Sequence, residues 1–191
     1  MISNRLKKQL DFIIEIDKIK NIFRMSYIAD GSRRENDAEH SWHLGIMTAI
    51  LSEYVEDDVD ISKVLKMVLI HDLVEIYAGD TFAFDEVGYI DKLDREEKAA
   101  EDLFGILPED QKEEFKVLWK EFEECKTREA KFGAMLDRLQ PLILDYATKG
   151  KGVKESNLTA EKLYKRNEIT MEEGPEEFKE LVKYIIEEVT K

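Results

Sequence analysis

Apolar side chains recur at helical spacing along most of this 191-residue chain. In the first segment they stand three or four residues apart, which predicts one amphipathic helix up to about residue 23. Its apolar positions are Leu6, Leu10, Ile13, Ile16, Ile19 and Phe23. The polar stretch at residues 29–37 then interrupts the pattern. Asp37 is the predicted N-cap of a second helix over residues 38–55, whose inner face includes His40 near its start.

A third helix is predicted over residues 61–78, with Asp60 as its cap and a glycine directly after it. This segment is apolar on nearly every side, which indicates a helix at the centre of the molecule. Within its second half this segment contains three ionisable residues, His71, Asp72 and Glu75. Because buried ionisable groups are costly unless something pairs with them, these side chains predict either a bend that exposes them or a bound group.

The helical pattern continues after an aromatic loop at residues 81–90. One charged helix is expected up to about Leu103, and another over residues 108–124 begins at a proline. Thr127 is the expected cap of a long helix that Pro141 should kink, because proline removes a backbone donor.

Two further helices are expected near the end of the chain, at about 160–168 and 175–190. The sequence contains no internal repeat and no Pro/Ser-rich linker. We therefore expect a single all-α domain over residues 1–191, with a core at about 10–150 and the C-terminal helices at about 158–190 packed on it.

The composition fits a helical protein and limits its partners. Apolar residues make up 43% of the chain and charged residues 38%, with only 9 Gly and 3 Pro. The 29 basic and 43 acidic residues give a net charge of −14, which repels nucleic-acid polymers and anionic membranes. We expect neither as a partner. A small anionic substrate still fits, because a metal or a local basic cluster reverses the field inside one pocket.

Cys125 is the single cysteine, so it cannot form an internal disulfide, which fits a reducing compartment. Near the N-terminus, charges at Asp11, Glu15 and Asp17 interrupt every apolar run, so neither a signal peptide nor a spanning helix is predicted. These features predict a cytoplasmic protein.

Five ionisable side chains on the predicted inner faces form a candidate metal site. His71 and Asp72 are about 100° apart around their helix, and Glu75 follows one turn later. His40 adds an imidazole from the second helix, and Asp137 adds a carboxylate from an apolar stretch of the long helix. Two imidazoles and two carboxylates suit Mn, Co, Fe, Ni or Zn.

An ordinary structural explanation exists for each of these residues taken alone. A buried histidine commonly hydrogen-bonds a backbone group, and Asp137 beside Arg138 is typical of a salt bridge. Gly133 and Ala134, one turn before Asp137, would leave space beside its carboxylate. The spacing by itself leaves the metal site and the structural explanation both open.

The order His40, then His71 and Asp72, then Asp137 resembles the metal signature of the HD superfamily of metal-dependent phosphohydrolases. The surrounding segments ENDAEHSWH, HDLVEIYAGD and LDRLQPL resemble its 5′-deoxynucleotidase branch. The similarity covers most of residues 10–150. It implies an HD-domain helical bundle in which these four residues hold one divalent ion in the core, with Mn, Co, Mg, Fe, Ni and Zn as the candidate metals.

The resemblance also implies catalytic roles for Glu75 and Asp80, which would act on the water and the substrate sugar. We expect Glu75 to be the acid/base and Asp80 its orienting partner, although the two roles are interchangeable at this stage. Nearby carboxylates orient water or transfer protons in phosphomonoester hydrolysis.

Three residues are candidate substrate contacts. Arg24 matches the position of a phosphate-binding arginine in deoxynucleotidase relatives, and a guanidinium grips phosphate through two parallel hydrogen bonds. Met25 stands where some relatives have a tryptophan that stacks on the base, so either Met25 or Tyr27 packs on the base or both belong to the core. Arg33 lines the pocket mouth or pairs with a nearby acidic residue; both readings stay open.

The expected function is a 5′-deoxynucleotidase that releases phosphate from deoxyribonucleoside 5′-monophosphates, and the resemblance also implies a homodimer. One alternative is an HD hydrolase for another nucleotide or small phosphate ester, and a second is a non-catalytic helical metal-binding or interaction module. A two-metal cyclic-nucleotide enzyme is disfavoured, because such relatives use additional histidines and this chain has three.

Overall fold

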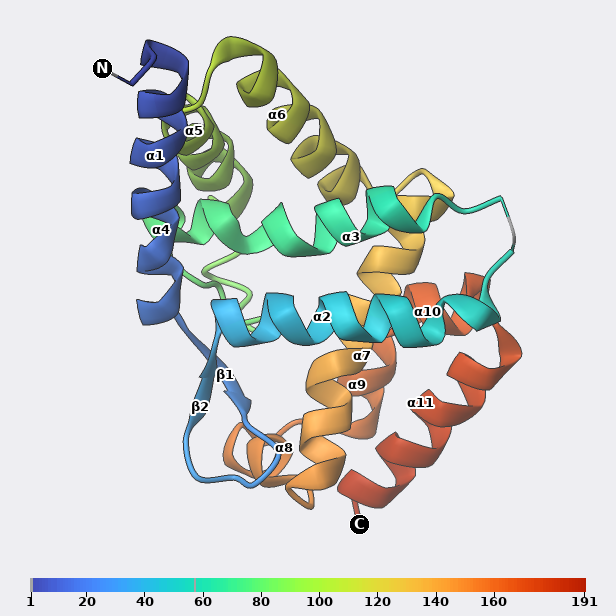
Figure 1. The fold of residues 1–191 in the computed structure, drawn as a ribbon. Coiled ribbons are helices and arrows are strands. Elements are labelled where there is room, and N and C mark those ends of the chain that lie inside the picture. The colour runs from blue at the N-terminus through green and yellow to red at the C-terminus, as the bar shows by residue number, and fades with distance from the viewer. Residues whose placement is uncertain (1, 57) are drawn as a thin grey trace.

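Helices form most of the protein in a computed structural model that describes residues 2–56 and 58–191 (Figure 1). The α-helices are α1 (Asn4–Glu15), α2 (Asp37–Leu51), α3 (Ile61–Ile70), α4 (Glu75–Ala78), α5 (Lys92–Phe104), α6 (Glu109–Glu124), α7 (Arg128–Ala147), α8 (Lys151–Glu155), α9 (Ala160–Arg166), α10 (Glu168–Glu173) and α11 (Glu176–Val189). The 3₁₀ turns are η1 (Ile16–Asn21), η2 (Ser52–Tyr54) and η3 (His71–Val74), and the strands are β1 (Phe23–Tyr27) and β2 (Arg34–Asn36).

The first predicted helix is wrong beyond residue 15. The chain continues as η1 and then as β1, which pairs antiparallel with β2 in a short hairpin that the sequence pattern did not predict (Figure 1). Phe23 pairs with Asn36 and Tyr27 with Arg34. Strand pairing supplies the backbone hydrogen bonds that a helix would otherwise make, and it depends on partners 7 and 13 residues away along the chain. The hairpin carries Arg24 and Met25.

The second helix has a different cap from the predicted one. Asn36 accepts a hydrogen bond from the Glu39 backbone, and the Glu39 side chain accepts one from the Asn36 backbone, so the two residues form a capping box. Asp37 is fully buried instead of capping. The predicted inner face is confirmed at His40, Leu44 and Met47, whose side chains are buried.

The central helix is divided into three parts. It begins at its predicted cap, Asp60, whose side chain accepts from the Lys63 backbone. The α-helical pattern changes to the 3₁₀ turn η3 at His71 and resumes at Glu75. Gly79 ends it with a φ of 78°, a conformation that suits glycine. The candidate ligands His71 and Asp72 therefore lie where the helix tightens.

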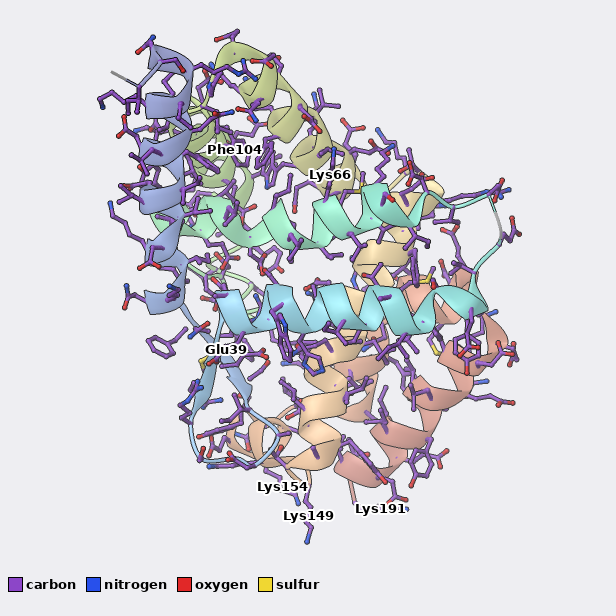
Figure 2. The ribbon with its side chains drawn as sticks, viewed as in Figure 1. Glu39, Lys66, Phe104, Lys149, Lys154 and Lys191 are labelled. Carbon is purple, nitrogen blue, oxygen red and sulfur yellow. The ribbon has the colours of Figure 1, made fainter. Side chains whose placement is uncertain are left out.

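Three central elements enclose the core. Figure 1 shows α2 and α3 side by side, and α7 packs against both of them. The helix α7 begins at the predicted cap Thr127 and contains Pro141. On one side Phe104, labelled in Figure 2, is fully buried and lies edge-on to Phe115 of α6. On the other side α11 packs against α7 and α9. In the described part of the chain, every helix is too short or too polar to cross a membrane.

Gly133 of α7 makes room for an aromatic side chain. A Cβ atom at this position would lie 2.9 Å from Cε2 of Phe122 and 3.4 Å from Val68 Cγ1. Phe122 in turn packs on the His71 ring, with 4.7 Å between centroids. The glycine therefore sets how closely α6 and α7 approach the turn η3.

We expect Gly133→Ala to lower the free energy of unfolding by about 1–3 kcal/mol, because the added methyl overpacks the contact with Phe122. Gly45→Ala is the matched control. Its Cβ would lie 3.8 Å from Leu69, an ordinary contact, and alanine inside a helix is favoured over glycine by roughly 0.5–1 kcal/mol. Urea unfolding measures both values, and equal stability of the two variants would contradict the proposed role of Gly133.

Candidate metal centre

The four predicted metal ligands converge from three elements. His40 comes from α2, His71 and Asp72 come from η3, and Asp137 comes from α7. His40 Nε2 lies 3.1 Å from Asp137 Oδ1, and His71 Nε2 lies 3.1 Å from Asp72 Oδ1. Cross distances are also short, with 3.7 Å from His40 Nε2 to Asp72 Oδ2 and from His71 Nε2 to Asp137 Oδ1. These atoms surround one small volume.

Both imidazoles present their Nε2 atoms to this volume. His71 Nδ1 lies 3.0 Å from the carbonyl oxygen of Val68, so Nδ1–H donates to the backbone. His40 Nδ1 lies 3.0 Å from Gln140 Oε1, also an acceptor. In each ring the outward nitrogen is therefore occupied, and the inward nitrogen is the one left for a ligand bond.

The electrostatics of the site favour a cation. Burial lowers the pKa of His71, but the negative charges of Asp72 and Asp137 outweigh it and raise that pKa to about 10. Burial tends to raise the pKa of Asp72, yet His71 and Arg24 hold it below the usual range of an aspartate. The His71 Nε2 atom is buried without a hydrogen-bond partner among the described residues. The Nε2 atoms of His40 and His71 and the carboxylates of Asp72 and Asp137 together form a donor set that fits a divalent metal.

Three further carboxyl groups lie beside the four predicted metal ligands. Oxygen atoms of Asp37, Glu75 and Asp80 lie within 4.8 Å of one another. Burial, reinforced by the charges of Asp72 and Asp37, raises the pKa of Glu75 well above its usual value. Burial and Asp72 likewise raise the pKa of Asp37 to about 7. This environment favours the protonated form of Glu75, which is the form that a general acid requires.

Arg24 connects the two groups. Its Nη1 donates to Asp72 Oδ2 at 2.7 Å and to Asp37 Oδ1 at 3.1 Å, and its Nη2 lies 3.9 Å from Asp137 Oδ1. Burial would lower the pKa of Arg24, but the surrounding carboxylates keep it above the usual arginine value. Its Nε is buried without a partner among the described residues, so one donor is uncommitted.

A cavity of about 280 Å³ opens onto this constellation. Among the predicted site residues, its walls include Arg24, Met25, His71, Asp72, Glu75, Asp80 and Asp137. Arg33 lies elsewhere: its guanidinium pairs with Glu39 at 2.6 Å on the exposed side of α2, where Figure 2 labels Glu39. Tyr27 is also directed away, since its hydroxyl donates to Glu155.

Sequence reasoning missed three residues that contact the site. Asp37 was assigned to a cap, and nothing in its local sequence distinguishes a capping aspartate from an inward one. Gln140 stands three residues after Asp137, a spacing that places both on one face of α7 and was available as a signal. Arg166 of α9 donates to Asp137 Oδ2 at 3.2 Å from 29 residues away, and only the tertiary fold reveals it. The neighbouring Arg138 instead donates to the backbone carbonyl of Ala134.

Comparisons of the sequence with known proteins give consistent matches. A family model described as HD domain matches residues 16–179. The 5′-deoxynucleotidase HDDC2 of Homo sapiens is 27% identical over 135 residues, which span 70% of this chain and 65% of the human protein. The HDDC2 5′-deoxynucleotidase of Dictyostelium discoideum is 27% identical over 147 residues, or 74% of this chain and 77% of that protein.

A solved structure from Magnetospirillum magnetotacticum MS-1 is similar over nearly the whole chain. It is described as a predicted metal-dependent phosphohydrolase and is 44% identical to this protein. The two structures superpose with a TM-score of 0.89, and the match covers 98% of this chain and 96% of that one.

We expect Mn²⁺ to stabilise the protein through this cluster. At 100 times its dissociation constant, a ligand that binds only the folded state adds about 2.7 kcal/mol, which corresponds to a rise in Tm of roughly 5–10 °C for a chain of this size. Asp72→Ala should remove the rise. Asp145→Asn is the control. Asp145 lines the same cavity but belongs neither to the cluster of predicted metal ligands nor to the group of Asp37, Glu75 and Asp80, so this variant should keep the rise. Differential scanning fluorimetry measures the shifts; an equal rise in Asp72→Ala would contradict the site.

Proposed function

Because this chain belongs to the HD-domain family, we propose that it is a metal-dependent phosphohydrolase that releases phosphate from deoxyribonucleoside 5′-monophosphates. The observation that carries the proposal is the convergence of two imidazoles and two carboxylates beside the buried Glu75, at the wall of a cavity of about 280 Å³. The 5′-deoxynucleotidase names of the human and Dictyostelium relatives support the choice of substrate.

His40, His71, Asp72 and Asp137 would hold the divalent ion. When bound there, such an ion supplies Lewis-acid polarisation of the phosphate and lowers the pKa of water. Candidate ions are Mn, Co, Mg, Fe, Ni and Zn, because sites of imidazole and carboxylate accept most of them.

Glu75 and Asp80 perform the proton chemistry in this proposal. Glu75 is buried at the cavity wall, and its raised pKa favours the protonated form, which can donate to the departing sugar oxygen. Asp80 belongs to the same group of carboxyl oxygens, and burial also raises its pKa. It orients the water or the sugar next to Glu75, and the reverse assignment of the two roles is the alternative.

Arg24 and Met25 are the proposed substrate contacts. The uncommitted Nε of Arg24 and its Nη2 group are donors suited to phosphate, and both lie beside the metal cluster. Met25 lines the cavity and is 41% exposed, which suits packing against a base. In the structure Arg33 pairs with Glu39, so its role as a substrate contact rests on the sequence alone.

The proposal extends to a homodimer in the cytoplasm with a small nucleotide as its ligand. Exposed apolar side chains of α2 and α3 support the dimer: Trp42 is 66% exposed, Leu69 49% and Ile46 45%. A second copy would cover this surface. The free thiol of Cys125 agrees with a reducing compartment.

Hydrolysis of another nucleotide or small phosphate ester is the second candidate, because the metal cluster would serve these substrates equally. A non-catalytic metal-binding module is the third, and the raised pKa of Glu75 argues against it, since metal binding alone needs no protonated acid beside the cluster.

With Mn²⁺ or Co²⁺ present, we expect the wild type to release inorganic phosphate from a panel of deoxyribonucleoside 5′-monophosphates. Asp72→Ala should abolish release because it removes a metal ligand. Glu75→Gln should keep the metal and lower kcat by about 10²–10⁴, the usual contribution of a general acid or base. A malachite-green assay with metal analysis distinguishes the two defects. Release from none of the nucleotides would refute the activity, and preferential release from another ester would favour the second candidate.

Arg24 and Arg33 form a matched pair for testing phosphate recognition. Arg24→Lys keeps the charge but loses the two-pronged guanidinium, so we expect kcat/KM to fall at least tenfold. Arg33→Ala should leave kcat/KM within about twofold, because its exposed pair with Glu39 contributes little. Steady-state kinetics decide between them, and the opposite ranking would assign the phosphate contact to Arg33.

A further inference from the structure

The candidate ligand His40 is supported from behind by a row of buried side chains. Its Nδ1 lies 3.0 Å from Gln140 Oε1. Gln140 Nε2 donates to Glu35 Oε1 at 2.7 Å and lies 3.1 Å from His43 Nδ1. His40 and Gln140 are completely buried, and Glu35 is 3% exposed. The four residues come from α2, α7 and β2, so the row joins three separate elements.

The partners of Gln140 determine which way its amide faces. Burial raises the pKa of Glu35 to about 7, so its carboxylate form predominates above neutral pH. In that form it only accepts hydrogen bonds, and it selects the NH₂ group of the amide. His43 Nδ1 accepts the second hydrogen of this group when its own ring carries the proton on Nε2. A flipped amide would place two oxygen atoms together at Glu35. The carbonyl oxygen of Gln140 is therefore directed at His40.

This orientation also places a proton on His40. Because the Gln140 oxygen accepts, Nδ1 of His40 carries the hydrogen, and Nε2 is turned towards Asp137 Oδ1 at 3.1 Å and Asp72 Oδ2 at 3.7 Å. His71 obtains the same orientation from the carbonyl oxygen of Val68. The backbone thus orients one imidazole, and a side chain orients the other.

We propose that Gln140, held by Glu35, is a positioning residue that fixes His40 with Nδ1 protonated and Nε2 directed at the metal centre. The consequence for metal affinity rests on the proposed function, whereas the hydrogen bond itself does not. Outer partners of ligating histidines typically change metal affinity by 10–100-fold. A backbone carbonyl cannot be lost by substitution, so His40 is the imidazole whose orientation depends on the sequence elsewhere.

The decisive variant is Gln140→Met, which keeps the length of the side chain and removes both hydrogen-bonding groups. We expect its dissociation constant for Mn²⁺, measured by isothermal titration calorimetry, to rise 10–100-fold. Glu35→Gln should give a smaller rise, because an amide at this position still accepts but no longer excludes the flipped form. The control is Leu139→Ala, a fully buried neighbour on α7, which should lower Tm and leave Mn²⁺ affinity within about twofold.

A second measurement reports the hydrogen bond without any metal. In protein labelled with ¹⁵N-histidine, the Nδ1–H resonance of His40 should be visible in the wild type. In Gln140→Met it should move upfield and exchange faster with water, because its acceptor is gone.

Two results would overturn the inference. The first is a Gln140→Met variant whose Mn²⁺ affinity stays within about twofold of the wild type, as expected for Leu139→Ala. The second is a wild-type His40 that lacks a proton on Nδ1. If the wild type binds no Mn²⁺, the proposed metal-dependent function fails, and the NMR result still decides whether Gln140 positions His40.

Discussion

Burial of several carboxyl groups around one guanidinium is the constraint on which the rest of this structure depends. Asp37, Asp72 and Glu75 are buried beside Arg24, and Asp137 is nearly so. Each buried charge costs several kcal/mol unless it is paired or neutralised. The protein solves this in two ways. Asp72 and Asp137 stay ionised against histidines and arginines, whereas Glu75 and Asp37 have raised pKa values.

This division separates two chemical roles within one cavity. The ionised pair, together with two Nε2 atoms, forms a set of donors for a divalent metal. In the neighbouring group of Asp37, Glu75 and Asp80, burial raises the pKa values and so favours the protonated forms. Enzymes commonly assign acid and base roles by driving the pKa values of neighbouring groups apart, and the environment here produces that difference.

The framework holds these groups through contacts from several separate elements. The change to a 3₁₀ turn at His71 places both ligands of η3 against α7, and Gly133 allows Phe122 to pack on the imidazole. The hairpin delivers Arg24 from the N-terminal side. Arg166 reaches Asp137 from α9, so the C-terminal helices take part in the site, which agrees with a family match that extends to residue 179.

The sequence alone determined the helical class and the caps at Asp60 and Thr127, because helical periodicity and local capping depend on neighbouring residues. It singled out His40, His71, Asp72 and Asp137 through the resemblance of their motifs, and the fold brings these four side chains together. The tertiary structure decided the features that depend on distant partners. It turned residues 23–27 into a strand, buried Asp37 beside Arg24, and moved the cap to Asn36. It also set the proton on His40 through Gln140, since an imidazole takes its orientation from whatever group lies behind it.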